Sequence, residues 1–206
     1  MPGTFRHTVF LLGAFSSLAG LAQQRTVKPS PATIDVAITY VAERAKIAST
    51  PCGCFWLEGA GMNAAVTFYR GLGVAANLTG GHASGVLPGV DLDKVSFMMG
   101  PRYTYQRSNW FGHDVGQNGG FRIFGEGLIG GVHAFNTVVP SSAGVAGAAS
   151  SFVFQVGGGV DRTLHKTIGI RIVEADYVRS TLPNAASNTQ HDLRLAAGIS
   201  FRFKNY

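Results

Sequence analysis

The chain has 206 residues, of which 46% are hydrophobic and only 14% are charged, and it contains 28 glycines and two cysteines. This length fits one domain or a small two-domain protein, and so little charge with so much glycine is unusual for a soluble globule. The formal net charge is +6, but the basic residues are dispersed singly, which argues against nucleic-acid binding because that function needs a clustered basic face.

The N-terminus has the pattern of a secretory signal peptide. A charged segment around Arg6 precedes an apolar run over residues 8–15, and small residues follow up to Ala22. We predict that residues 1–22 are removed and that the protein is exported. A signal anchor is the alternative, but the apolar run is too short for one. Residues 23–32 are polar and contain proline, and are predicted to form a periplasmic lead-in.

No later stretch offers about 18 consecutive apolar residues, so no helical membrane span is predicted after the signal peptide. Instead, many segments alternate between apolar and small or polar residues, which is the period of a β-strand. The clearest is residues 193–203, with leucine, isoleucine and phenylalanine on one parity and arginine, glycine and serine on the other. A soluble sheet turns such an apolar face inward to a core, whereas a membrane barrel turns it outward to lipid.

Taken in chain order, the alternation predicts strands over residues 33–43, 55–68, 72–79, 95–106, 121–129, 152–160, 167–179 and 193–203. Turns or loops are predicted over residues 46–53, 69–71, 80–91, 107–120, 136–150, 161–166 and 184–189. The loop over 136–150 consists mostly of small residues and is expected to be mobile.

Two irregularities are expected within these strands. The parity is blurred between Glu58 and Gly61, where a bulge is plausible. In the seventh strand, Glu174 and Asp176 would share the isoleucine face unless a bulge near Val173 returned both acids to the opposite face.

These features predict an all-β fold: an eight-stranded antiparallel up-and-down transmembrane barrel over residues 33–203, followed by a short tail, 204–206. The even number of strands, their lengths of about 11 to 15 residues and their consecutive hairpin order fit a closed barrel.

The parity opposite to the apolar one is mostly small, with a few ionisable residues: Glu43, Arg102, Glu126, Arg171, Glu174, Asp176, Arg194 and Arg202. In a soluble sandwich this face would be rich in lysine and long polar residues, so its composition favours a narrow barrel lumen. Because an isolated buried charge costs several kcal/mol, these residues are expected to form ion pairs, with Glu174 and Asp176 pairing with Arg194. We interpret the pairs as a device for stability and register without a transport role.

Aromatic residues fall near the predicted strand ends, as in the two interfacial girdles of a membrane barrel. They are Tyr40, Trp56, Phe68, Tyr69, Tyr103, Tyr105, Trp110, Phe121, Phe135, Tyr177, Phe201 and Phe203.

With its hairpin order, its Gly100-Pro101-Arg102-Tyr103-Thr104-Tyr105 and Glu174-Ala175-Asp176-Tyr177 strands and its aromatic-ending last strand, the chain resembles the OmpA-like eight-stranded outer-membrane barrels of Gram-negative bacteria. The resemblance implies an outer-membrane location among lipids and lipopolysaccharide, periplasmic termini and a lumen plugged by ion pairs. It also implies insertion by the barrel-assembly machinery, with Phe201 and Phe203 as the assembly signal. A monomer is expected. No peptidoglycan-binding domain follows the barrel, so anchoring to the cell wall is not carried over.

Two clusters could carry chemistry. Cys52 and Cys54 lie in the first loop, where a labile disulfide is the leading interpretation for an exported chain, with free thiols or a metal pair as alternatives. His82-Ala83-Ser84 is followed by Asp91 and Asp93, and outer-membrane lipid A deacylases are barrels with a His-x-Ser pair and an acid.

The other histidines are scattered over different connections, so neither a metal site nor a cofactor is predicted. The sequence therefore favours a barrel with a structural or surface-interaction role that is not an enzyme. The alternatives are a small passive pore, a soluble exported lipid-binding barrel and a lipid hydrolase.

Overall fold

A computed structural model of the chain describes residues 32–46, 53–107, 109–110, 113–114, 120–141, 144–183 and 188–204. The predicted signal peptide and nearly all of the lead-in lie outside the described residues. Within those ranges no helix is long and apolar enough to cross a membrane.

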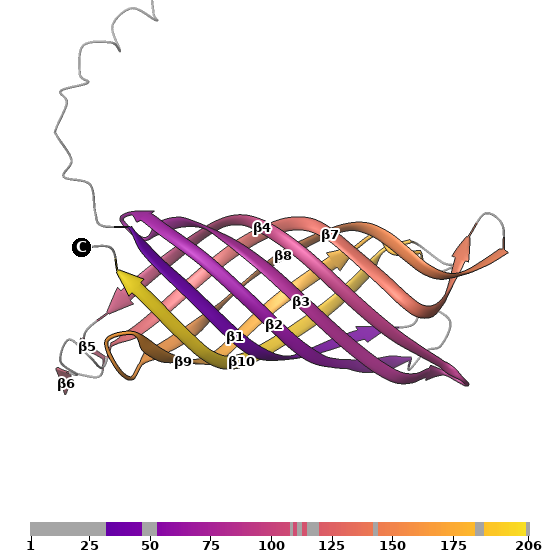
Figure 1. The fold of residues 1–206 in the computed structure, drawn as a ribbon, viewed down its shortest axis with the longest axis horizontal. Coiled ribbons are helices and arrows are strands. Elements are labelled where there is room, and N and C mark those ends of the chain that lie inside the picture. Colours follow the sequence, from indigo (N-terminus) through magenta and orange to yellow (C-terminus); the bar gives the residue numbers. More distant parts are fainter. Residues whose placement is uncertain are drawn as a thin grey trace, which may run out of the picture.

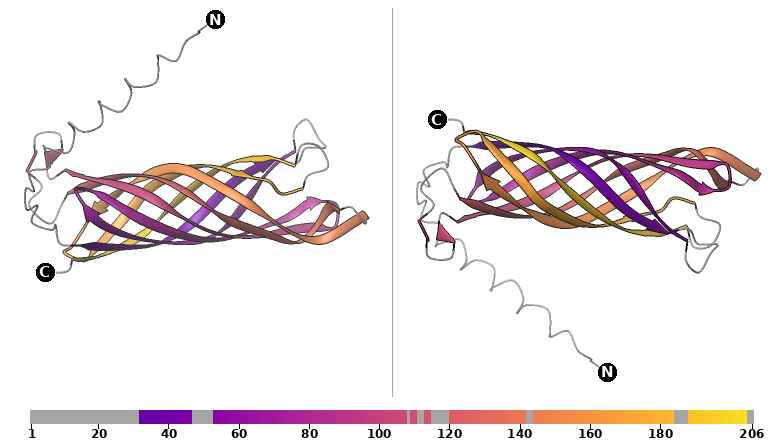
Figure 2. Two further views of the ribbon diagram at one scale, coloured as in Figure 1. Left: turned by 90° about the horizontal axis from the view of Figure 1, so that it is seen from above. Right: turned by 90° about the horizontal axis from the view of Figure 1, so that it is seen from below.

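Eight long strands form a closed antiparallel barrel (Figures 1 and 2). They are β1 (Thr33–Lys46), β2 (Cys54–Tyr69), β3 (Leu72–Leu87), β4 (Val90–Arg107), β7 (Phe121–Ser141), β8 (Gly144–Thr163), β9 (Ile168–Ser180) and β10 (Gln190–Lys204). Two short strands in the predicted 107–120 connection, β5 (Asn109–Trp110) and β6 (His113–Asp114), pair only with each other. Each barrel strand pairs with the barrel strands before and after it in sequence, and β1 pairs with β10 to close the cylinder. The predicted eight-stranded up-and-down barrel is confirmed.

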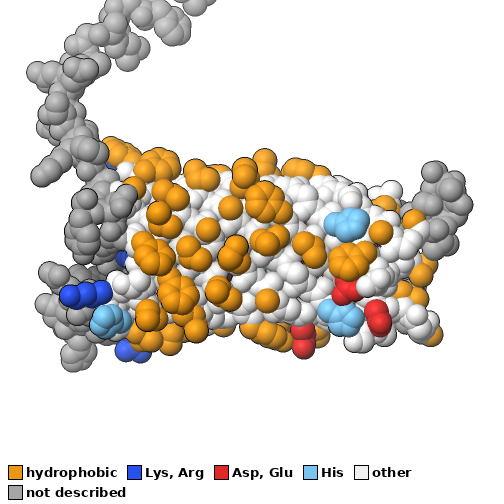
Figure 3. All heavy atoms as spheres, viewed as in Figure 1, with side chains coloured by type: hydrophobic (Ala, Val, Ile, Leu, Met, Phe, Trp, Pro, Cys, Tyr) orange, Lys and Arg blue, Asp and Glu red, His pale blue; other side chains and the backbone are white. Residues whose placement is uncertain are grey.

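The apolar parity of the strands faces outward. Ile38 and Ile199, opposite each other in the β1/β10 ladder, are 57% and 52% exposed, whereas Ala37 is 1% exposed. Figure 3 shows apolar side chains spread over the outer surface, with acidic side chains toward one end and Lys or Arg side chains toward the other. This arrangement contradicts the soluble lipid-binding barrel, which would hold its apolar parity inside.

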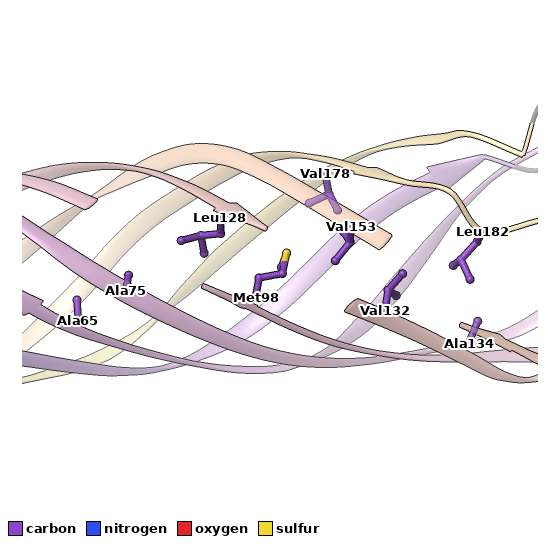
Figure 4. Packing of buried hydrophobic residues seen from close by; sticks show 9 residues of the cluster. All are labelled: Ala65, Ala75, Met98, Leu128, Val132, Ala134, Val153, Val178 and Leu182. Atoms are coloured by element: carbon purple, nitrogen blue, oxygen red, sulfur yellow. The ribbon is translucent and has the colours of Figure 1, made fainter. Parts of the chain in front are cut away.

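Side chains fill the interior. A cluster of small and medium apolar residues lies inside the barrel (Figure 4): Ala65, Ala75, Met98, Leu128, Val132, Ala134, Val153, Val178 and Leu182. Met98 and Leu128 are fully buried. Arg171 and Arg194 are the largest fully buried side chains, so the lumen contains charged groups as well as this apolar cluster.

Several strands extend further than the alternation predicted. β3 continues to Leu87, so the predicted loop over 80–91 shrinks to a turn at Pro88-Gly89, where Gly89 has a φ of +73°. The predicted loop over 136–150 is wrong for most of its length, because β7 and β8 form a hairpin up to Ser141 and Gly144. Away from the apolar band both faces of a strand can be polar. The backbone pairing continues there, but the sequence no longer alternates, so the pattern does not predict where the strand ends.

The two predicted bulges have opposite outcomes. In β9, Ile172 and Val173 both face outward, and the register with both neighbouring strands shifts there, so the bulge near Val173 is confirmed. In β2 the register against β1 is continuous from Cys54 to Thr67, so the bulge near Glu58 is wrong. Glu58 faces outward at the polar end of the barrel. An exposed carboxylate is tolerated there, so no bulge is needed to turn it inward.

Candidate functional site

All eight ionisable residues predicted for the lumen point into the barrel: Glu43, Arg102, Glu126, Arg171, Glu174, Asp176, Arg194 and Arg202. Seven are buried, and the Arg202 side chain, near the rim where β1 begins and β10 ends, is 13% exposed. Their partners define two ion-pair clusters, one in each half of the barrel.

The outer cluster, in the half away from the start of β1 and the end of β10, is centred on Glu43 of β1. Arg194 Nη2 and Nε lie 2.9 Å and 3.0 Å from Glu43 Oε2, since the two residues face each other in the β1/β10 ladder. Lys94 reaches across the lumen from β4, donates to Glu43 Oε1 and lies 3.1 Å from Asp192 Oδ2. Glu43 therefore pairs with both cations, and Asp192 supplies the second negative charge that balances them.

The predicted pairing of Glu174 and Asp176 with Arg194 is wrong. Arg194 faces Asp176 on β9 and Glu43 on β1, and its guanidinium binds Glu43 and donates to Gln155 Oε1 at 2.9 Å. Glu174 instead accepts from Arg171 Nη1 at 2.6 Å. The bulge in β9 explains this choice, because it puts residues three apart in sequence on the same face of the strand.

The inner cluster is a chain of alternating charges. Arg171 Nε lies 2.9 Å from Asp161 Oδ1, and Arg122 Nη2 lies 3.4 Å from Asp161 Oδ2. Arg122 also binds Asp35, whose Oδ1 lies 3.4 Å from Arg202 Nε. The inner half is thus crossed by ion pairs from five strands, β1, β7, β8, β9 and β10.

Phe124 connects the inner cluster to Arg102. The guanidinium carbons of Arg102 and Arg171 lie 3.7 Å and 4.4 Å from the Phe124 ring centroid. Arg102 Nη1 also lies 2.5 Å from Asn63 Oδ1 and 3.5 Å from Glu126 Oε2. Both guanidinium groups therefore contact the same buried aromatic ring, which adds cation–π attraction to the ion pairs.

Five buried charged partners were not identified from the sequence: Asp35, Lys94, Arg122, Asp161 and Asp192. Lys94 immediately precedes the predicted strand over 95–106, and Asp161 lies in the predicted turn over 161–166. Asp35 and Arg122 already lie on the lumen parity of their predicted strands, so parity alone could have identified them, whereas Lys94, Asp161 and Asp192 fall on it only once their strands are extended.

Asp176 differs from the other buried acids because its carboxyl group has no hydrogen-bond donor among the residues that the structure describes. It is 1% exposed, and neither of its oxygens lies within hydrogen-bond distance of a donor in the described part of the chain. It faces Gly157 of β8, where an added Cβ would lie 2.0 Å from Asp176 Oδ1, so this close approach requires glycine.

We expect Asp176→Asn to raise the free energy of unfolding by about 1–3 kcal/mol, because it removes an uncompensated buried carboxyl group while keeping its shape. Urea titration of the refolded barrel in lipid vesicles measures this effect. Asp192→Asn is the control and should destabilise, since Asp192 pairs with Lys94. A destabilised Asp176→Asn would contradict the assignment of Asp176 as unpaired.

At the outer rim, His82 of β3 forms two hydrogen bonds with predicted site residues. His82 Nδ1 lies 2.7 Å from Asp93 Oδ1, and His82 Nε2 lies 3.2 Å from Ser84 Oγ. Asp91 does not join them; its Oδ1 accepts from the Gly85 amide at 2.9 Å. The structure therefore brings His82, Ser84 and Asp93 together.

The remaining predicted residues are only partly described. Cys54 is exposed at the start of β2, but Cys52 lies outside the described residues, so the disulfide stays a prediction. Phe201 and Phe203 both lie on the outward parity of β10, and Phe203 is exposed.

The aromatic residues occupy two levels. Exposed members at the end where β1 begins and β10 ends include Phe68, Tyr69, Tyr103, Tyr105 and Phe203, and those toward the other end include Tyr40, Trp56 and Tyr177. Phe121 and Phe135 are partly buried, and the Trp110 side chain lies outside the described part.

No model of a known protein family matches the chain, and no curated protein sequence matches it either. Solved structures do. Ail, the attachment invasion locus protein of Yersinia pestis, solved with the heparin analogue sucrose octasulfate, matches with a TM-score of 0.53 and 19% identity over 84% of this chain and 100% of Ail. Neisserial surface protein A matches with a TM-score of 0.55 and 14% identity over 85% of this chain and 99% of that protein. At these identities the likeness concerns the fold, and the chain has the fold of the eight-stranded outer-membrane barrels.

Proposed function

We propose that this protein is an integral barrel of the bacterial outer membrane with a structural or surface-interaction role and a lumen closed by ion pairs. The observation that carries the proposal is the inverted arrangement of its side chains. Apolar residues such as Ile38 and Phe97 are more than half exposed on the outside, while Arg171 and Arg194 are buried inside. Such a surface is stable in lipid and would aggregate in water.

The height of the apolar surface fits one bilayer. On β1 the outward apolar residues run from Ile34 to Ala42, about nine residues, which is the length that a tilted strand needs to cross the hydrocarbon core. Above this band each barrel strand turns a polar residue outward: Arg44, Glu58, His82, Asp93, His133, Ser150, Arg179 and His191. We call these eight residues the outer polar ring, and its level corresponds to the head groups of lipids and lipopolysaccharide.

We infer the orientation from the start of β1 and the end of β10. Thr33 faces Lys204 in the β1/β10 ladder, so both ends of the barrel lie at one rim, which we assign to the periplasm. The protein would be a monomer inserted by the barrel-assembly machinery.

The hairpin of β7 and β8 extends beyond the outer polar ring (Figure 1). It offers a surface for a partner outside the cell. A surface-interaction role is supported by the likeness to Ail, which was solved with a heparin analogue.

Fractionation combined with gel mobility tests the membrane placement. The protein is expected in the outer-membrane fraction, soluble only with detergent, and it should migrate faster unheated than boiled. Recovery in the soluble periplasmic fraction would overturn the proposal.

A planar bilayer then tests the closed lumen, since the two ion-pair clusters and the apolar cluster predict no conductance steps. Regular steps would support the small passive pore instead.

The assembly role of the last strand gives a separate prediction. Phe203→Ala should lower the yield of inserted barrel in vivo several-fold, because an aromatic residue at the end of β10 is the proposed assembly signal. Phe152→Ala on β8 is the matched control, since Phe152 and Phe203 are 55% and 51% exposed on the same outer surface. Equal yields for the two variants would contradict this assignment.

A further inference from the structure

We propose that the outer polar ring carries a hydrolytic site in which Ser84, His82 and Asp93 cleave acyl esters of lipids in the outer leaflet. The inference goes beyond the proposed structural role and rests on it only for the position of the site relative to the membrane.

The three side chains have the geometry of a nucleophile, a base and an orienting acid. Because the Asp93 carboxylate can only accept, the 2.7 Å contact requires a proton on His82 Nδ1. In neutral imidazole His82 Nε2 is then the acceptor, and the Ser84 hydroxyl 3.2 Å away donates to it. This is the tautomer that a base needs to remove the proton of a serine nucleophile.

The strands hold this arrangement through their register. His82 and Asp93 face each other across the β3/β4 ladder, and Ser84 lies two residues further along the same face of β3. The ladder is interrupted just there, since its register jumps from Ala83 to Leu87. Gly85 has a φ of +64° in this bulge, and its amide is bound by Asp91. Ser84 therefore lies at a bulge, a feature that re-aims side chains beside active sites.

The acid is itself oriented. Asn136 of β7 donates to Asp93 Oδ2, so both oxygens of Asp93 are engaged. The hydrogen bond from Asn136, followed by that from His82, holds the pKa of the Asp93 carboxyl below its ordinary value. From the opposite neighbour, β2, Glu58 faces His82. An imidazolium formed during the reaction would thus have a carboxylate on each side.

The site is open toward the membrane surface. The His82 side chain is 53% exposed and Asp93 is 21% exposed. Below His82 on the outward face of β3 comes Gly80, where an added Cβ would meet nothing within 4 Å, and then the exposed Leu78. A lipid acyl chain can lie along this narrow apolar track while its ester group reaches the level of Ser84. This position selects an ester at the boundary of head group and hydrocarbon as substrate.

The reaction is an ester hydrolysis with water as co-reactant. Ser84 Oγ forms a bond to the acyl carbonyl carbon, its proton passes to His82 Nε2, and the ester C–O bond breaks as that proton moves to the departing alcohol oxygen. Water then attacks the acyl-serine, gives a proton to His82 and releases the fatty acid. The proton returns from His82 to Ser84 Oγ, so that ester and water become acid and alcohol.

The barrel also contains a matched pair without the acid. His133 of β7 and Ser150 of β8 face each other, with His133 Nδ1 2.7 Å from Ser150 Oγ. Among the described residues no carboxylate is hydrogen-bonded to His133. His82 and His133 both belong to the outer polar ring, so this second pair shares the environment of the proposed site but lacks its acid.

The test uses the refolded full barrel in micelles, with 4-nitrophenyl dodecanoate as substrate and a fluorophosphonate as serine-directed label. Ser84→Ala and Asp93→Asn should each reduce ester hydrolysis at least about 100-fold, and labelling should occur on Ser84. Ser150→Ala should retain wild-type turnover. Heat-modifiable mobility verifies that each variant is folded. Equal hydrolysis by wild type and Ser84→Ala, or no hydrolysis by the folded wild type, would overturn the proposal.

The lipid source is distinguished by two further substrates, vesicles of phosphatidylethanolamine and purified lipopolysaccharide. Release of fatty acid from either, lost in Ser84→Ala, supports lipid hydrolysis and identifies the lipid class. Release from neither would overturn the assignment of a lipid substrate. These assays are independent of cell fractionation, so failure of the hydrolytic site and failure of the membrane placement give different results.

Discussion

Glu43→Gln should lower the free energy of unfolding by about 3–5 kcal/mol, because removing one member of a buried charge network leaves its partners uncompensated. Glu43 is 3% exposed and binds both Arg194 and Lys94. The amide keeps the volume of the side chain but not its charge. Lys94 retains Asp192, whereas Arg194 loses its bonded carboxylate. Equilibrium urea unfolding in lipid vesicles, followed by tryptophan fluorescence, measures the change.

Glu58→Gln is the control for this experiment. Glu58 lies on the neighbouring strand β2 but faces outward in the outer polar ring. Its stability should match that of the wild type, since an exposed carboxylate has water as a partner. If both variants lost the same amount, the Glu43 network would not be the cause.

Arg171→Met should cost a similar amount, again about 3–5 kcal/mol, through the inner cluster. Arg171 is 1% exposed and is the hydrogen-bonded partner of Glu174, at 2.6 Å. Asp161 keeps a contact with Arg122 after the substitution, but Glu174 is left as a buried acid without a cation bonded to it. The Phe124 ring also loses one of its two guanidinium neighbours.

Arg179→Met on the same strand is the matched control, since Arg179 faces outward in the outer polar ring. The urea midpoints of the two variants separate the effect of the buried pair from the effect of losing a positive charge on β9. A wild-type midpoint for Arg171→Met would show that Glu174 needs no cation.

Alternation was sufficient to predict the barrel and its sidedness. The alternation of apolar and polar residues reflects two environments, lipid outside and a packed lumen inside. Each strand alternates wherever its two faces meet these different environments. The bulge near Val173 was predictable for the same reason, because two acids cannot lie on the isoleucine face in lipid. The extensions of β3, β7 and β8 were not predictable, because there the contrast between the two faces disappears.

The members of the lumen could be assigned by parity, but their partners could not. Arg194 has a facing acid on each neighbouring strand, and the choice of Glu43 over Asp176 depends on the side-chain geometry inside the closed barrel. The contact of Lys94 with Asp192 crosses the lumen between residues 98 positions apart. Local sequence carries no information about which strands face each other across a cylinder.

The rim site shows the same limit. The spacing of His82 and Ser84 places them on one strand face, but it left Asp91 and Asp93 equally eligible as the acid. Only the β3/β4 register, which sets Asp93 opposite His82, decides between them.

The bulge in β9 limits where residues can be inserted or deleted in this strand. Below Ile172 the odd-numbered positions point inward, and above Val173 the even-numbered positions do. β9 therefore consists of two half-strands of opposite phase. Deleting Ile172 or Val173 would remove the extra residue and give an unbroken alternation with Glu174 and Asp176 still facing the lumen, whereas deleting or inserting one residue elsewhere in the strand would reverse the direction of the side chains on one side of the change. Changes in length are therefore expected in the hairpin tips, and within β9 only the loss of the extra residue at the bulge should leave the direction of the other side chains unchanged.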